Sequence, residues 1–162
     1  ILLYNTFNDE LAGEYLRTVY EHCPNIKSLS LGVISEFATE FENLLMKCYR
    51  LRKIFIQGLT IANIFVSTDL SLLFDILVEI APDSLHEISI VYRNNVSKDD
   101  LEAFFENWRG REPIILNFYV EPCHKLNFEK LISVFEKYEE EGVLKRYDAL
   151  EDYGDFIELL QN

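Results

Sequence analysis

Large apolar residues recur along this chain in the arrangement L-x-x-L-x-L, in which L is any large apolar residue and x is mostly polar. The second and third apolar positions of each copy are two residues apart, which is the period of a β-strand. The motif is clear in three places and weaker in two. We therefore predict five short strands, near residues 26–31, 51–56, 85–90, 114–119 and 144–149.

The copies of the motif follow one another at similar distances. Their middle positions are Leu29, Ile54, Ile88, Leu116 and Tyr147. The steps between these positions are 25, 34, 28 and 31 residues. Several units of this length in a row are typical of a solenoid, in which one supersecondary unit is stacked on the next. The longest step contains "TIANIFVSTD" at 60–69, which we expect to form a loop or a short extra segment.

Between the predicted strands, apolar residues keep the spacing of three and four that gives a helix one apolar face. Segments with this spacing lie at 11–23, 37–48, 101–108 and 128–135. The segment 69–80 is apolar on all sides, which predicts a more buried helix. Ser97 with Asp100 three residues later resembles a capping box, and Asn127 is expected to cap the helix that follows it.

Each unit is therefore predicted to be a helix, a short turn and a strand. One such unit cannot bury its apolar face alone, and stacking the units builds a continuous core. We predict an α/β protein with one domain over 1–162, formed by about five units with a parallel sheet on the concave side and helices on the convex side. The last twelve residues, "EDYGDFIELLQN", are expected to close the C-terminal end of the stack.

Composition and charge narrow the classes of function. The chain has 162 residues, 49% of them hydrophobic, and a formal net charge of −13. This charge repels phosphate backbones, so we expect no nucleic-acid partner. No apolar run reaches the length of a membrane-spanning helix, and the first residues lack the basic region of a signal peptide. Three cysteines form no dense disulfide framework, which favours the cytoplasm or the nucleus.

The cysteines and histidines raise the question of a metal. His22 stands beside Cys23, and His124 stands beside Cys123. However, no C-x-x-C occurs and the pairs lack the spacing of structural zinc sites, so we expect no metal and no cofactor. Cys23 and Cys48 occupy the same place in two copies of the repeat, and we predict that both are buried, free and in register.

No set of residues with catalytic spacing is visible. The three histidines have no acid or nucleophile partner in the sequence, and the chain lacks a glycine-rich phosphate loop. Carboxylates are so frequent that any pair could be proposed as acid and base, which carries no information. The chain is therefore not expected to be an enzyme, and an enzyme with a degenerate site is the least favoured alternative.

The positions between the inward-facing strand residues would form one extended surface in a solenoid. Aromatic and basic residues on such a surface are typical binding anchors. We predict that this face binds a protein partner. The predicted binding residues are Lys53, Phe55, Gln57, Glu87, Ser89, Asn117, Tyr119 and Arg146.

The stretch "CPNIKSLSL" at 23–31 has the pattern C-x-x-L-x-x-L-x-L, which resembles the cysteine-containing leucine-rich repeats of F-box proteins. The later phrases "APDSLHEISI", "LEAFFENWRGREP" and "FEKYEEEGVLKRY" look like the divergent fungal F-box/leucine-rich-repeat family, so the resemblance covers nearly the whole chain. The family usually places Asn or Cys shortly after L-x-L, whereas this chain has Ile34 and Leu59 there.

The resemblance implies a leucine-rich-repeat-like fold and a role as the substrate-recognition repeats of an F-box-type ubiquitin ligase subunit. We find no F-box in this sequence, so we expect the chain to be a fragment of a longer protein that reaches the ligase adaptor only through an F-box outside it. A leucine-rich-repeat scaffold in signalling or immunity, with no link to ubiquitin, is the alternative.

Overall fold

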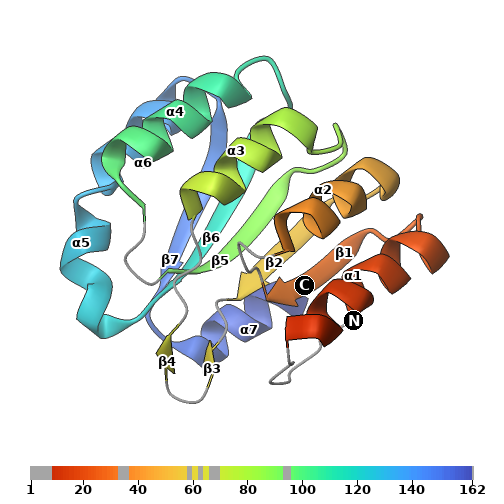
Figure 1. Ribbon diagram of the computed structural model, residues 1–162. Coiled ribbons are helices and arrows are strands. Elements are labelled where there is room, and N and C mark those ends of the chain that lie inside the picture. Colours follow the sequence, from red (N-terminus) through yellow and green to blue (C-terminus); the bar gives the residue numbers. More distant parts are fainter. Residues whose placement is uncertain are drawn as a thin grey trace.

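A five-stranded parallel sheet forms the centre of the protein in a computed structural model (Figure 1). The structure describes residues 9–32, 37–57, 60–61, 64–65, 70–92 and 96–161. The strands of the sheet are β1 (Ser28–Gly32), β2 (Lys53–Gln57), β5 (Glu87–Tyr92), β6 (Ile114–Val120) and β7 (Leu144–Leu150). Neighbours in the sheet are also neighbours in chain order, and every pairing is parallel. The predicted α/β class and the five strands are confirmed.

The register of the sheet follows the repeat in the sequence. The middle apolar positions of the five motif copies pair with one another from strand to strand. These are Leu29, Ile54, Ile88, Leu116 and Tyr147. The first four are buried. The sequence pattern thus predicted which residues lie side by side, because a shift of one residue would turn every apolar side chain to the other face.

Five helices precede the five strands and cover one face of the sheet (Figure 1). They are α1 (Asp9–His22), α2 (Ala38–Lys47), α3 (Leu70–Ile80), α4 (Lys98–Trp108) and α6 (Ile132–Glu140). Each packs on the next in this order. Ser97 caps α4 with the predicted capping box, since its hydroxyl accepts from the Asp100 backbone N–H and the Asp100 carboxylate accepts from the Ser97 N–H.

Aromatic rings fill the space between these helices and the sheet. Phe74 of α3 stacks on Phe104 of α4 at 4.5 Å between ring centroids, and Phe105 stacks on Tyr138 of α6 at 4.7 Å. Because consecutive helices share these rings, the core is continuous from one unit to the next. Trp108 is buried as well, and its indole N–H donates to the backbone oxygen of Glu112 at 3.0 Å.

The longest step between strands contains a small hairpin. It consists of β3 (Thr60–Ile61) and β4 (Ile64–Phe65), which pair antiparallel in a sheet of their own. This agrees with the short extra segment expected there.

The structure between β6 and α6 shows that the predicted helix cap at Asn127 is wrong. A 3₁₀ turn, η2 (Pro122–His124), runs into the short helix α5 (Lys125–Glu129), and α6 starts only after two turn residues. The apolar spacing at 128–135 therefore spans two helices. Asn127 lies inside α5 and caps nothing; Leu131 occupies the cap position of α6 without a side-chain hydrogen bond.

The turns that link helix to strand repeat in detail around the cysteines. The backbone N–H of Cys23 donates to Val19, and the N–H of Cys48 donates to Leu44, at 2.8 Å each. Both thiols are free. The prediction that both are buried is wrong for Cys23, which is exposed while Cys48 is fully buried. Cys23 ends α1, the outermost helix of the layer, whereas Cys48 ends α2, which has a helix on each side (Figure 1).

The C-terminal helix α7 (Tyr153–Gln161) lies on the opposite face of the sheet (Figure 1). Asp152 caps it, because its carboxylate accepts from the backbone N–H groups of Gly154 and Asp155 at 2.7 and 3.2 Å. We expected this segment to close the end of the stack. Instead, α7 extends back from β7 across neighbouring strands, so that Phe156 reaches Phe55 of β2.

Candidate partner-binding face

The strand face is the face of the sheet opposite the layer of α1, α2, α3, α4 and α6. Its side chains form three rows that run across the strands. The first row is Ser28, Lys53, Glu87, Ile115 and Arg146. The middle row is Ser30, Phe55, Ser89, Asn117 and Asp148. The third row is Val91, Tyr119 and Leu150. The rows contain seven of the eight predicted binding residues, and the side chain of the eighth, Gln57, lies outside the described residues.

Helix α7 covers the third row and part of the middle row. Phe156 is fully buried, and its ring centroid lies 5.5 Å from that of Phe55 in an edge-on arrangement. The same ring lies 5.9 Å from Tyr119, which also meets Tyr153 at 5.0 Å. These residues form a second apolar cluster, separate from the main core. The prediction of Phe55 as a binding anchor is therefore wrong, because its ring is buried and packs on Phe156 of α7.

A buried polar network occupies the centre of the strand face. The Asn117 side-chain amide donates to Glu87 Oε1 at 3.2 Å and to Ser89 Oγ at 3.0 Å. Glu87 Oε2 lies 3.2 Å from Lys53 Nζ, so the network joins β2, β5 and β6. Glu87, Ser89 and Asn117 are all buried. These three predicted anchors therefore present little surface to a partner.

One acceptor in this network is left over. Asn117 is fully buried, and its Oδ1 has no hydrogen-bond partner among the described residues. A buried acceptor without a partner costs about 1–3 kcal/mol, so such a group is retained in a fold only where other contacts compensate for it. Here the side-chain NH₂ group of Asn117 donates two hydrogen bonds that link β6 to β5, and these bonds offset the cost of the unpaired oxygen.

The first row, apart from the buried Glu87, is the accessible part of the strand face. The side chains of Lys53 and Arg146 are 37% and 54% exposed. Ile115 lies between them half-buried. Arg146 Nε is 3.5 Å from Oδ2 of Asp148 in the middle row, and Lys53 pairs with Glu87 within the first row, so both cations face a carboxylate of the chain. Of the predicted anchors, Lys53 and Arg146 are thus available, and Tyr119 is half-buried beside α7.

Among the described residues, the carboxyl groups with clearly shifted pKa values lie in the helical layer and not on the strand face. Hydrogen bonds from Arg17 hold the pKa of Glu40 below its usual value, and those from Ser97 do the same for Asp100. Hydrogen bonds from Arg109 and then Tyr138 lower the pKa of Glu106 to about 2. A general acid at neutral pH needs a raised carboxyl pKa, so these groups fit structural pairing instead.

A different group of side chains gathers at the end of β6. Glu121, Cys123 and His124 bring one ligand atom each within 4.8 Å of one another. Sequence reasoning considered His124 with Cys123 and missed Glu121. A carboxylate two residues before a cysteine is too common to indicate a site until the turn between them is known.

No family model, no curated protein and no solved structure matches this chain. Within the part of the chain that the structure describes, no helix combines the length and the apolar character needed to cross a membrane.

Proposed function

We propose that this chain is a protein-binding scaffold of the leucine-rich-repeat type, a solenoid that binds a partner on its strand face and does not catalyse a reaction on it. The observation that carries the proposal is the registered stack: five helix–strand units in chain order align their strand residues in rows, and the first row stays outside the part of the face that α7 covers. In solenoids such faces are the usual binding surfaces.

The free part of this face sets what a partner must look like. Helix α7 occupies the third row, so the partner would lie along the first row, over the amino-terminal halves of the strands. Lys53 and Arg146 supply cationic groups there, each beside a carboxylate of the chain, Glu87 at 3.2 Å and Asp148 at 3.5 Å. Ile115 lies next to Arg146 in the row and supplies an apolar contact. A partner segment with a carboxylate on either side of an apolar side chain fits this order.

We further propose that the chain is the substrate-recognition part of an F-box-type ubiquitin ligase subunit. This half of the proposal rests on the resemblance of "CPNIKSLSL" and the later repeats to that family. The exposed free thiols of Cys23 and Cys123 suit a reducing compartment, and we propose that the protein acts in the cytoplasm or nucleus. The acidic chain is not proposed to bind nucleic acid.

Affinity capture with the wild-type chain and with a Lys53→Ala, Arg146→Ala double variant tests the binding surface. If the first row holds the partner, the double variant should bind at least about 30-fold more weakly, which corresponds to about 2 kcal/mol for a pair of anchors. The matched control is Lys98→Ala with Lys130→Ala, which removes two exposed lysines from the helical side. A partner lost equally in both double variants, or in neither, would refute the strand-face site.

The ligase half needs a separate test. The full-length protein that contains this chain should co-precipitate the cullin-ligase adaptor, and the chain alone should not. A full-length protein that leaves the adaptor unbound would remove the ubiquitin link and leave the alternative, a general leucine-rich-repeat scaffold.

A further inference from the structure

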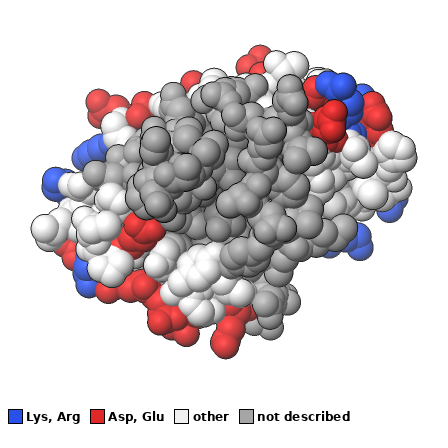
Figure 2. Space-filling view, turned by 60° about the horizontal axis from the view of Figure 1, so that its bottom comes forward, with Lys and Arg blue, Asp and Glu red and all other residues white. Residues whose placement is uncertain are grey.

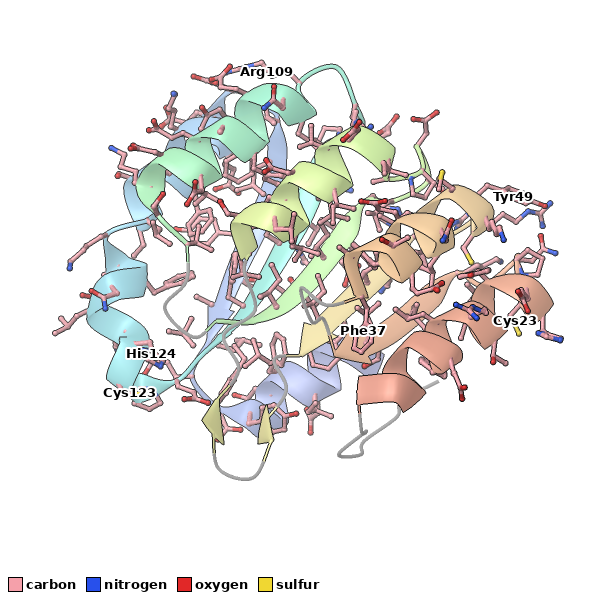
Figure 3. All side chains as sticks on the ribbon, in the orientation of Figure 1. Cys23, Phe37, Tyr49, Arg109, Cys123 and His124 are labelled. Atoms are coloured by element: carbon pink, nitrogen blue, oxygen red, sulfur yellow. The ribbon has the colours of Figure 1, made fainter. Side chains whose placement is uncertain are left out.

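Three side chains with metal-binding atoms converge directly after β6. The Glu121 carboxylate, the Cys123 thiol and the His124 imidazole each place one ligand atom within 4.8 Å of the other two. Cys123 and His124 lie next to each other at the start of the connection to α5 (Figure 3). The Cys123 sulfur already lies 3.9 Å from Glu121 Oε2. The three groups therefore form a cluster in space as well as in sequence.

The local backbone explains the convergence. Pro122 starts the 3₁₀ turn η2, and its fixed φ suits the first position of a helical turn. The His124 N–H donates to the Glu121 carbonyl at 2.8 Å, which closes the turn. If β6 continued as a strand, successive side chains would point to opposite faces. The turn instead holds a carboxylate, a thiol and an imidazole on one small surface.

We propose that Glu121, Cys123 and His124 bind a divalent transition-metal ion of the zinc type. Thiolate and imidazole are the ligands that select zinc over magnesium or calcium, and a carboxylate is an accepted third ligand. With zinc–ligand bonds of about 2.0–2.3 Å, tetrahedral ligand atoms lie roughly 3.5 Å apart. Side-chain rotations at the exposed Cys123 and the half-buried Glu121 and His124 would close the remaining gap. Three protein ligands leave a fourth position for water or for a group of another molecule.

The surrounding charges favour a cation. The chain carries a net charge of −13. Asp and Glu side chains are prominent along the lower edge of the face in Figure 2, and Lys and Arg side chains also lie on its left. The nearest cation in sequence, Lys125, pairs with Glu151 at 2.6 Å. This end of the protein is therefore suited to attract a metal ion.

The chain contains its own comparison for this site. His22 and Cys23 are the same two residue types side by side, and both are exposed. The imidazole Nδ1 of His22 lies 3.1 Å from the Thr18 carbonyl oxygen. Among the described residues, no third ligand joins this pair within the distance that unites the cluster after β6. A surface Cys–His pair without a third ligand thus serves as the control.

Titration of the reduced chain with Co²⁺, followed by displacement with Zn²⁺, tests the site. The wild-type chain should bind one Co²⁺ per chain with a thiolate-to-cobalt charge-transfer band. Cys123→Ser should remove the band and weaken Zn²⁺ binding at least about tenfold, since even loss of an outer partner costs that much. Glu121→Gln should weaken binding while keeping the band. The matched control Cys23→Ser should behave as the wild type.

The outcomes separate the site from general metal binding by surface thiols. Equal losses in Cys123→Ser and Cys23→Ser would overturn the proposal, and so would a band that survives Cys123→Ser. A ratio of one ion per two chains, with dimers in size-exclusion chromatography, would also overturn it, because the ion would then bridge two copies. All the substituted side chains except Glu121 are exposed or lie on the short turn, and circular dichroism checks that each variant is folded.

Discussion

Phe156 packs α7 on the strand face, so its replacement by alanine should release the helix. The side chain is fully buried and packs on Phe55 and Tyr119 in the second apolar cluster. Because this cluster is separate from the main core, we predict that Phe156→Ala undocks α7 without unfolding the five helix–strand units.

The magnitude follows from burial and ring contacts. Replacing a fully buried phenylalanine by alanine costs about 3–5 kcal/mol, which includes the cavity that remains. Edge-on ring pairs contribute about 0.5–1.5 kcal/mol beyond their buried area. Since about 1.4 kcal/mol is a tenfold change in an equilibrium, the open form of α7 should become more populated by roughly two to four powers of ten.

Hydrogen exchange read by mass spectrometry measures this change segment by segment. Exchange should accelerate strongly in peptides from 153–161 and remain slow in peptides from β5. The control is Phe105→Ala, which removes a fully buried ring of the same size from the main core and should accelerate exchange throughout. If Phe156→Ala accelerates β5 as much as α7, then the helix belongs to the same cooperative unit as the sheet and our reasoning is wrong.

Three further predictions concern the helical layer. Native thiol labelling should modify Cys23 rapidly and Cys48 slowly, because Cys48 is buried and burial raises the pKa of its thiol. In urea unfolding, Cys48→Tyr should lower the free energy of unfolding by about 1–3 kcal/mol, because the larger side chain overpacks the core. Ser97→Ala should lower the free energy of unfolding by about 0.5–2 kcal/mol in the same assay, because it removes the capping box of α4. Hydrogen bonds from Arg109 are the largest cause that lowers the pKa of Glu106 from 4.5 to about 2 in the folded chain. The stabilisation that Glu106 contributes is therefore fully present above about pH 4.5 and is lost as the pH falls toward 2. A Glu106→Gln variant should be less stable than the wild type at pH 7, and the two should converge at low pH.

The strands and their register could be predicted from the sequence because the information is local and repeated. The alternation around Leu29, Ile54 and Ile88 fixes which side of each strand is apolar, and burial of that side fixes the pairing. The capping box at Ser97 is equally local, since all its partners lie within four residues. Asn127 failed as a cap because a helix start depends on the backbone around it, and the chain is already helical there.

The tertiary structure alone decided what covers the strand face. Phe55 and Phe156 are 101 positions apart in sequence, and no pattern along the chain says that a terminal amphipathic helix will pack on the outer face of the sheet instead of at its end. Cys23 and Cys48 share one motif, yet only the second has a helix on both sides. Glu121 joins Cys123 and His124 only because a 3₁₀ turn folds them together. The apolar periodicity of a segment shows which face of a helix or strand is apolar. Whether a given side chain is buried, and which distant residue it contacts, depends on how the elements pack on one another, and this is decided only in the folded chain.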